Sequence, residues 1–369
     1  MKSMRRNFAT SPPIGRVGAG VIRCATQRQV FRPWLAWAIT LLGVGAVLEV
    51  AAYASISVCP GDPPECDYKT IQEAINAAQN GEIITVQEPG TYAGNSLTAG
   101  KQGITIKSKD PNARDSYIIS GGGPVVVLGL GWVLEGFTIM GGSSTDGGGV
   151  TFAGTATIRD CVIHNNTASG GGGGVFSLSG SADLTVEKSV IRNNQAAYGG
   201  GISVVGGNIK LVDSQVHDNE SAAFAGGIDA GGDLVIEDSQ IYGNTVAGGA
   251  AGGILKRNQN RPVRIAKSSI TGNVSSGDGA GLKISAGDVE IVGSVIAGNT
   301  AGTTGGGVQL IGGSVSFLGV AVTTNTSSSG GGGIHCVGGG CAREFLRVSR
   351  RQYACRSGWY LRNPAMCAR

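Results

Sequence analysis

Residues 199–220 read GGGISVVGGNIKLVDSQVHDNE. In this stretch a glycine-rich step ends at Ile202, apolar and polar residues then alternate, and Val216 is followed after two residues by Asn219. The same order of features recurs about every 26 residues between residues 147 and 334. Two markers that keep one period in register predict a repeat architecture and argue against a low-complexity segment.

Aliphatic residues end each glycine-rich step and fill fixed positions before each asparagine. The residues that end the steps are Val150, Val175, Ile202, Ile228, Ile254, Leu282, Val308 and Ile334. Before Asn219, Ile209 and Leu211 are apolar and Lys210 between them is polar, which is the alternation of a half-buried strand. One repeat is too short to bury its own apolar face, so it must stack on the next copy. We therefore expect a parallel β-solenoid with two or three short strands per repeat and rungs about 4.8 Å apart.

An asparagine stands at one fixed position of every repeat. The column consists of Asn166, Asn194, Asn219, Asn244, Asn273, Asn299 and Asn325. Stacked copies bring these side chains above one another, and stacked asparagines bond from rung to rung. The column is therefore predicted to be a structural ladder.

The segment before the repeats has the features of a solenoid cap. Thr70 and Glu73 form a capping-box pattern that predicts a short helix over residues 71–78. A helix at this place can cover the strand edges at the N-terminal end of a solenoid. Strand-like runs follow at residues 82–86, 103–107, 117–120, 125–128 and 132–140.

This cap resembles a known superfamily. Residues 68–78, the strand 84–86 and the turn Pro89-Gly90-Thr91-Tyr92 are similar to the N-terminal cap of right-handed parallel β-helix, or pectin-lyase-like, proteins. The resemblance covers about residues 67–336 and implies a right-handed coil. The expected fold is therefore all-β, a right-handed parallel β-helix of roughly ten to twelve rungs with a short N-terminal capping helix.

The later repeats also resemble those of chlamydial-type polymorphic outer-membrane proteins. The usual forms there are G-G-A-aliphatic and F-x-x-N. Here Gly or Ala precedes the aliphatic residue, and Ile or Val replaces Phe. This second resemblance implies a place at the cell envelope.

Charge and hydropathy divide the chain into four parts. Residues 1–54 hold seven Lys and Arg but one acidic residue, and the segment 34–54 is apolar apart from Glu49. We interpret residues 1–54 as a signal peptide or, if it stays uncleaved, a signal anchor. The remainder then lies outside the cytoplasm, secreted or attached to the cell envelope. The other parts are the cap and first rungs at 55–146, the repeat region at 147–341, and an irregular Arg-rich tail, aberrant or truncated, at 342–369.

The formal net charge of +4 comes from the two ends of the chain. Residues 55–341 carry 23 acidic and 15 basic residues, so the predicted solenoid is acidic. Nucleic-acid binding needs a basic stripe that releases counterions from phosphates, and none is present. We therefore expect no nucleic-acid partner.

Four of the eight cysteines flank short loops just outside the two ends of the repeats. Cys59 and Cys66 bracket one loop, and Cys336 and Cys341 bracket the other. Such pairs are candidates for disulfide bonds in an oxidising compartment. No Cys/His spacing typical of zinc occurs, so no metal site is predicted from these residues.

The superfamily resemblance implies carboxylates and cations on adjacent rungs as the catalytic groups of its enzymes. Asp213 and Asp238 occupy one position of successive repeats, and Glu237 adjoins the second. Carboxylates about 4.8 Å apart can bind Ca²⁺, or one of them can have a raised pKa. Lys188 and Lys267 flank the pair at the same position, so a solvated charge ladder accounts for these residues without a ligand. The three carboxylates stay candidates for catalysis, and no cofactor other than Ca²⁺ is considered.

A further column follows the aliphatic residue of each glycine-rich step. It reads Thr151, Phe176, Ser203, Asp229, Leu255, Lys283, Gln309 and His335. We expect these side chains to be exposed to solvent. They form no aromatic ladder of the kind that a sugar-binding groove uses.

The sequence alone therefore favours an exported or surface-attached repeat protein that acts as a structural, adhesive or binding module. Its expected partners are carbohydrate or cell-surface ligands, with the membrane as a further partner if segment 34–54 is retained. The alternative is a carbohydrate-active polysaccharide lyase or glycoside hydrolase of the pectin-lyase-like superfamily that uses Asp213, Glu237 and Asp238. The motifs N-T-D, D-D, G-H-G and R-I-K of polygalacturonase-like hydrolases do not occur in the chain.

Overall fold

The computed structural model describes residues 55–61, 65–95, 100–257 and 260–337, together with two short strands in the C-terminal stretch. The predicted signal or anchor, residues 1–54, lies outside the described residues. Within the described ranges, no helix has the length and apolar character needed to span a membrane.

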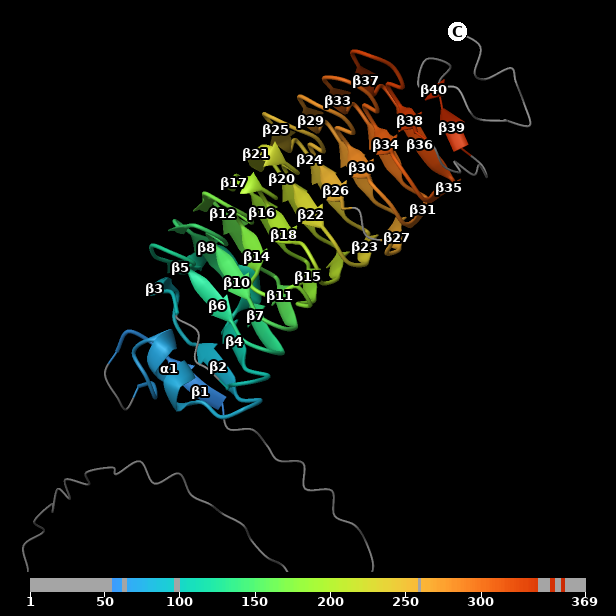
Figure 1. Cartoon of the computed structure of the whole chain (residues 1–369). Helices are drawn as coiled ribbons and strands as arrows, with labels where there is room; N and C mark the ends of the chain where they lie inside the picture. The colour runs from blue at the N-terminus through green and yellow to red at the C-terminus, as the bar shows by residue number, and fades with distance from the viewer. Residues whose placement is uncertain are drawn as a thin grey trace, which may run out of the picture. The chain divides into compact units, whose positions relative to one another are not determined.

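The chain from residue 55 onward winds into a solenoid in which each rung stacks on the one before it (Figure 1). Neighbouring strands within each sheet pair in parallel, for example Ile209 with Leu234 and Leu211 with Ile236. Four sheets run along the solenoid, and we name them A to D in the order in which a strand from each is met within a repeat. The prediction of two or three strands per repeat was therefore too low, because it missed the very short strands of sheet C.

Sheets A and B each contain 11 strands, which agrees with the predicted number of rungs. Sheet A consists of β1 (Ser55–Val58), β2 (Ile83–Val86), β4 (Thr105–Ser108), β7 (Trp132–Glu135), β11 (Ala156–Arg159), β15 (Leu184–Glu187), β19 (Ile209–Val212), β23 (Leu234–Glu237), β27 (Val263–Ala266), β31 (Asp288–Val292) and β35 (Ser314–Leu318). Sheet B consists of β3 (Gly90–Ala93), β5 (Tyr117–Ser120), β8 (Thr138–Met140), β12 (Val162–His164), β16 (Val190–Arg192), β20 (Gln215–His217), β24 (Gln240–Tyr242), β28 (Ser269–Thr271), β32 (Val295–Ala297), β36 (Val320–Thr323) and β39 (Leu346–Val348).

Sheets C and D contain eight and ten strands. Sheet C consists of β9 (Ser143–Ser144), β13 (Thr167–Ala168), β17 (Gln195–Tyr198), β21 (Glu220–Phe224), β25 (Thr245–Val246), β29 (Val274–Ser275), β33 (Thr300–Ala301) and β37 (Thr326–Ser327). Sheet D consists of β6 (Val126–Leu128), β10 (Val150–Phe152), β14 (Val175–Ser177), β18 (Ile202–Val204), β22 (Ile228–Ala230), β26 (Ile254–Lys256), β30 (Leu282–Ile284), β34 (Val308–Leu310), β38 (Ile334–Cys336) and β40 (Tyr353–Cys355).

The core lies inside the four sheets and is built from the predicted aliphatic columns. Ile209 and Leu211 in β19, like Leu234 and Ile236 in β23, are buried and belong to one continuous cluster along the solenoid. Lys210 between the first two is exposed, as the strand alternation requires. Like residues thus pack on like residues from rung to rung.

The N-terminal end is covered as predicted by the short helix α1 (Ile71–Ala77). Thr70 and Glu73 form the capping box, because each side chain accepts a hydrogen bond from the backbone N–H of the other residue. At the other end of α1, Lys101 Nζ donates to the carbonyl of Asn76 at 2.8 Å. A second, irregular helical segment, η1 (Pro111–Ser116), packs on β4, β5 and β8.

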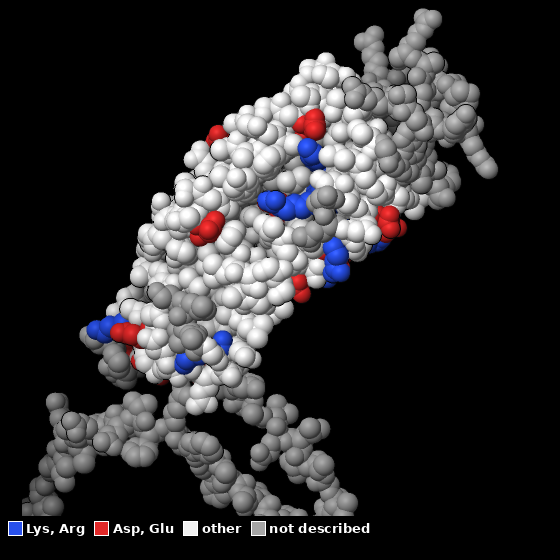
Figure 2. Space-filling view, viewed as in Figure 1, with Lys and Arg blue, Asp and Glu red and all other residues white. Residues whose placement is uncertain are grey.

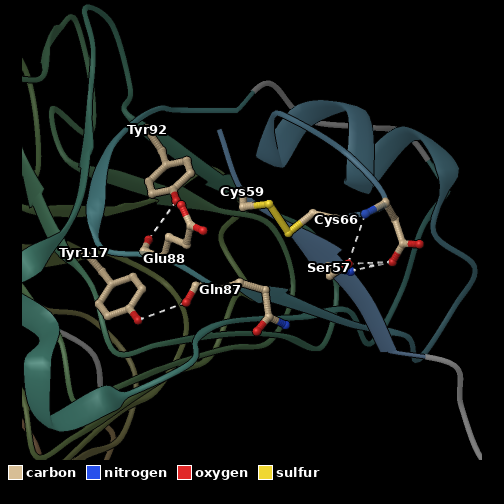
Figure 3. The surroundings of a disulfide bond; sticks show 8 residues. Ser57, Cys59, Cys66, Gln87, Glu88, Tyr92 and Tyr117 are labelled. Carbon is tan, nitrogen blue, oxygen red and sulfur yellow. Dashed lines mark hydrogen bonds between the residues drawn. A yellow bond between two sulfur atoms is a disulfide. The ribbon is translucent and has the colours of Figure 1, made fainter. Parts of the chain in front are cut away.

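A disulfide joins Cys59 to Cys66 beside α1 (Figure 3). Next to it, the backbone N–H and the hydroxyl of Ser57 both donate to Asp67 Oδ2, at 2.9 and 2.8 Å. Tyr92 closes the following turn by donating to the Glu88 carbonyl at 2.7 Å. The disulfide and the Asp67 bonds hold the loop after β1 against that strand.

The Arg-rich stretch 342–369 contains more regular structure than the sequence suggested. β39 pairs in parallel with β36 in sheet B, and β40 pairs with β38 in sheet D. The expectation of an irregular tail is therefore wrong for these two segments. Short strands of this kind carry too little periodicity to be recognised without the strands on which they stack.

Candidate functional site

The asparagine column lies inside the corner between sheets B and C. Asn194 donates from its backbone N and from Nδ2 to Asn219 Oδ1, both at 3.0 Å, and its Nδ2 also donates to the Ile163 carbonyl at 3.0 Å. The other members of the column repeat this pattern, and each is at most 2% exposed. Their amides are therefore used within the fold and do not reach a ligand.

A second ladder, formed by small residues at one fixed position of the repeats, runs along the corner between sheets A and B. The backbone N–H of Ser189 donates to Ser214 Oγ at 3.1 Å, while Ser189 Oγ donates to the Glu187 carbonyl at 2.7 Å. Cys161 occupies the same position one rung earlier, and its thiol lies 3.1 Å from the Arg159 carbonyl. Burial raises the pKa of the Cys161 thiol to about 12, so this cysteine is not a nucleophile near neutral pH.

The candidate carboxylates Asp213 and Asp238 lie at a left-handed turn just before the serine ladder. Their φ angles are 48° and 49°, and Lys188 and Lys267 at the same position have φ angles of 48° and 49°. Four exposed residues of opposite charge thus share one backbone conformation, and the same position is glycine in later rungs. No ion pair joins these four residues in the described structure. The backbone of the turn, rather than a charge ladder, therefore explains this column.

Glu237 belongs to a different surface from Asp213 and Asp238. It lies on the outer face of sheet A, where its Oε1 is 3.8 Å from Arg264 Nε. Arg264 also pairs with Glu290 on the next rung, as the strand register requires. The three candidates are neighbours, since the backbone N–H of Asp213 donates to the Glu237 carbonyl at 3.1 Å, and their role in catalysis stays a prediction. In the part of the chain that is described, no cluster of three or more His, Cys, Asp or Glu side chains is placed to hold a metal ion.

The two predicted cysteine pairs differ in what the structure describes. Cys59 and Cys66 are bonded to each other. Cys336 is also disulfide-bonded, but Cys341 lies outside the described residues. The second pairing therefore stays a prediction.

The column after each glycine-rich step is not exposed, contrary to our expectation. Ser203, Asp229 and Gln309 on the outer side of sheet D are at most 3% exposed. The cause is the loop from sheet C, which folds back over these side chains. A Cβ atom at Gly199 would lie 2.8 Å from the Cβ of Ser203, and Gly199 has a φ of +58°. Glycine favours this turn and this close approach, although Ala225 and Ala251 adopt the same conformation on the next two rungs with φ angles of 56° and 69°. These steps cover the outer side of sheet D.

This cover is incomplete beside β26, where a groove of about 220 Å³ opens. Phe224 at the end of β21, Leu255 in β26 and Lys283 in β30 line it. Arg257 and Ser285, which directly follow β26 and β30, complete the lining. Figure 2 shows the corresponding face mostly white, with a group of blue and red side chains near its middle.

Phe224, which lines the groove, belongs to an exposed aromatic pair. The rings of Tyr198 and Phe224 are stacked with centroids 6.1 Å apart and an interplanar angle of 14°. The two residues are 41% and 42% exposed, which is unusual for large aromatic side chains with no apolar cover. Neither residue belongs to the column that follows the glycine-rich steps, so the sequence pattern did not predict this pair. The signal that would have found it is the aromatic residue just before two successive steps.

A buried carboxylate holds the cation at the opposite rim. Asp229 in β22 is fully buried, and Arg257 Nε donates to its Oδ1 at 2.7 Å while Arg257 Nη2 bonds its Oδ2. Burial raises the pKa of Asp229, and the hydrogen bonds and charge of Arg257 oppose that shift. The hydrogen bond to Asp229 in turn raises the pKa of Arg257, so the guanidinium stays protonated.

The second cation of the groove is also paired. Lys283 Nζ lies 3.3 Å from Asp278 Oδ2, and Asp278 accepts further hydrogen bonds from the hydroxyls of Thr303 and Thr304. Burial alone would raise the pKa of Asp278, but the Thr303 hydrogen bond and the Lys283 charge hold it below its usual range. The lowered pKa of Asp278 keeps this carboxylate ionised near neutral pH, whereas burial leaves the pKa of Asp229 raised in spite of its bonds to Arg257.

Directly behind the groove, Lys256 breaks the repeat pattern. Its neighbour Leu255 points outward, so Lys256 points into the core, where it is fully buried and donates from Nζ to the Gly231 carbonyl at 2.6 Å. Burial lowers the pKa of Lys256, while the charge of Asp233 acts in the opposite direction. The repeat is thus irregular at the rung that carries the groove, and such local departures are expected at functional sites.

A wider hollow of about 360 Å³ lies over sheet C, but its chemistry is poorer. Its lining consists mainly of alanines with Thr167, Ser169 and Gln195, and Glu220 is its one charged residue. Glu220 accepts a hydrogen bond from Gln195 Nε2 at 2.9 Å. We therefore take the smaller groove beside β26, which combines aromatic, apolar, cationic and hydroxyl groups, as the candidate site.

The fold defines a β-helix repeat protein, and the groove is the candidate site on its sheet D. The chain belongs to the family described as "Right handed beta helix region", whose model matches residues 70–225 and 173–345. The coil is therefore right-handed, as the superfamily resemblance implied. A search of curated protein sequences finds no significant match to this chain.

Two solved structures are similar in fold. The crystal structure of pectate lyase Pel9A is 14% identical, with a TM-score of 0.41 over 81% of this chain and 80% of that one. The pectin methylesterase from carrot is 13% identical, with a TM-score of 0.38 over 77% of this chain and 88% of that one. At this level of sequence identity, the similarity indicates the fold alone and says nothing about activity.

Proposed function

We propose that this protein is an exported or surface-attached binding module that holds carbohydrate in the groove beside β26. The observation that carries the proposal is the exposed stack of Tyr198 and Phe224 next to Arg257. Aromatic faces and edges supply apolar contact to the C–H faces of sugar rings, while nearby polar groups supply hydrogen bonds. The groove offers both within one rung spacing.

The ionisation of the groove favours binding over catalysis. A general base works best with a pKa near the operating pH, whereas the pKa of Arg257 is raised by Asp229. Lys256 is the lysine with the lowered pKa, but its side chain points into the core and cannot meet a substrate. The alternative of a polysaccharide lyase or glycoside hydrolase has support in the fold family alone.

The cellular location is proposed from the N-terminal segment and the cysteines. The apolar segment 34–54 with its basic flank suits an export signal or anchor, and the Cys59–Cys66 disulfide suits an oxidising compartment. The resemblance of the repeats to polymorphic outer-membrane proteins adds the cell envelope as the place of attachment. If the protein is attached to the surface, protease treatment of intact cells should degrade the repeat region. If it is secreted, the repeat region should be found in the medium. Protection until the cells are lysed would contradict export.

The binding proposal is tested by titrating the purified protein with oligosaccharides and following the heat released. Phe224→Ala should weaken binding by about 1–3 kcal/mol, the usual contribution of one aromatic contact to a sugar or base. Val274→Ala on sheet C removes an exposed apolar side chain outside the groove and serves as the matched control. Product analysis of the same mixtures shows whether any saccharide is cleaved. Cleavage that depends on the groove would favour the enzyme alternative, and no binding to any saccharide would refute the proposal.

A further inference from the structure

The buried Asp229 lies behind the groove and is bonded to Arg257, which lines it. It lies on β22 between Ser203 of β18 and Leu255 of β26, and these three side chains stack in register on the outer side of sheet D. Ala225, Ala251 and Leu255 form a small apolar cluster above it, separate from the main core. A carboxylate in such surroundings needs a bonded cation, and Arg257 supplies it through two nitrogens.

The same bonds fix how Arg257 is presented. Its side chain is 34% exposed, and the guanidinium forms one rim of the groove. Nε and Nη2 are used by Asp229, so Nη1 is the nitrogen that remains for a ligand. A guanidinium held in this way is a rigid hydrogen-bond donor whose positive charge is cancelled at close range.

The charge of the other cation is cancelled as well. Lys283 pairs with Asp278, which Thr303 and Thr304 hold in place. The two cations that line the groove are therefore each paired with a carboxylate, and between them Phe224 and Leu255 offer apolar surface. The groove presents hydrogen-bond donors without an attractive field for a negatively charged ligand.

From this arrangement we infer that the Asp229–Arg257 pair makes the groove selective for uncharged saccharides and against acidic ones. The inference rests on the proposed carbohydrate-binding function and names the ligand class. A neutral sugar exchanges hydroxyl hydrogen bonds with Arg257, Lys283 and Ser285 and lays an apolar face against Phe224. A uronate carboxylate placed at the same rim meets a guanidinium whose charge is already paired with Asp229, so Asp229 is a specificity-determining residue that acts through Arg257.

The test compares neutral and acidic oligosaccharides of equal length, such as galactan and galacturonan fragments, by titration at two salt concentrations. The unmodified protein should bind its best neutral oligosaccharide at least about tenfold more tightly than the acidic one, because a uronate carboxylate loses hydration in the groove without a net positive charge to bind it. Its affinity should change little with salt, since no net charge is neutralised on binding.

Asp229→Asn removes the carboxylate charge and keeps the side-chain shape. This variant should lose most of the preference, and its binding of acidic fragments should become stronger at low salt. Asp278→Asn removes the carboxylate that pairs with Lys283 at a partly exposed position, and it should shift the preference in the same direction. This second variant keeps the test decisive if Asp229→Asn folds poorly. Asp213→Asn, on another side of the solenoid, is the matched control and should leave the preference unchanged.

Two outcomes would contradict the inference in different ways. Preference of the unmodified protein for acidic fragments, or an unchanged preference in folded Asp229→Asn and Asp278→Asn, would overturn the selectivity while leaving carbohydrate binding intact. Failure of every neutral and acidic fragment to bind would refute the proposed function itself, and the selectivity with it.

Discussion

At several positions of this protein, the backbone conformation rather than the side-chain chemistry explains which residue is present. Asn193 and Asn194 are neighbours, yet the first is exposed with a φ of 53° and the second is a buried member of the ladder. Asp213 and Lys188 likewise share one left-handed turn although their charges are opposite. Residue type alone therefore does not reveal which of these positions takes part in buried hydrogen bonds, binding or catalysis.

The ladder predicts a large difference between the two adjacent asparagines. Asn194→Ala should lower the free energy of unfolding by about 1–3 kcal/mol, because Asn166, Asn219 and the Ile163 carbonyl lose buried hydrogen-bond partners. Asn193→Gly should stay within about 0.5 kcal/mol, since glycine accepts the same backbone conformation. Urea unfolding of both variants measures the difference. Equal effects would argue against a hydrogen-bonded ladder.

The turn explanation of Asp213 can be separated from a catalytic or calcium-binding role. Asp213→Gly should be neutral or stabilising, whereas Asp213→Ala should cost about 1 kcal/mol, because alanine is disfavoured at a φ of 48°. Melting curves of the two variants with and without Ca²⁺ give the answer. A calcium-dependent rise in the melting temperature of the parent protein that both variants lose would restore Asp213 as a metal ligand.

At the scale of the strand, alternation decides which residues carry the stability. In β23, Leu234 and Ile236 face the core, while Val235 between them faces outward beside Lys210 and Arg264. A shift of the strand by one residue would exchange these faces. The register of β23 is therefore a direct consequence of the apolar pattern.

Two alanine substitutions in β23 test this register. Ile236→Ala should reduce the free energy of unfolding by about 2–5 kcal/mol through lost burial and a cavity. Val235→Ala should change it by about 0.5 kcal/mol, as expected at a half-exposed position. Denaturant unfolding at matched protein concentration provides both values. A larger effect at Val235 than at Ile236 would mean that the register is off by one residue.

At the scale of the whole molecule, the solenoid depends on how its ends are covered. Helix α1 covers the first rungs, and β39 and β40 extend sheets B and D at the other end. An uncovered end would expose unpaired strand edges, which invite association with other chains. The Arg-rich stretch therefore contributes strands to the end of the solenoid, although it lacks the repeat motif.

Hydrogen exchange can test that contribution in the full chain. The amides within Leu346–Val348 and Tyr353–Cys355 should exchange more slowly than those of an unfolded peptide, because parallel pairing with β36 and β38 engages them. The backbone amides of β23, which lies in the middle of the solenoid and pairs with β19 and β27, serve as the protected reference. Exchange at the unprotected rate in both segments would show that these strands do not form in solution.

Much of the architecture was predictable because equivalent positions of successive repeats contact one another. The aliphatic columns, the asparagine ladder and the capping box of α1 are each encoded by local spacing, so the sequence predicted them correctly. The serine ladder follows the same rule and was recognisable in principle. The two strands of the Arg-rich stretch do not follow it, since each is defined only by the strand on which it stacks.

The amino-acid sequence by itself determined the stacking of this protein, because hydrophobic burial and ladder bonds act between residues one repeat apart. Only the tertiary structure decided what the outer surface does. Asp229 became buried because the glycine-rich loop before it folds back over sheet D. Asp213 and Asp238 lie at a left-handed turn, and Glu237 ends the strand β23 next to it. The groove of Phe224, Leu255, Arg257 and Lys283 joins non-equivalent positions of different rungs, and such contacts depend on the path of the corners rather than on the repeat itself.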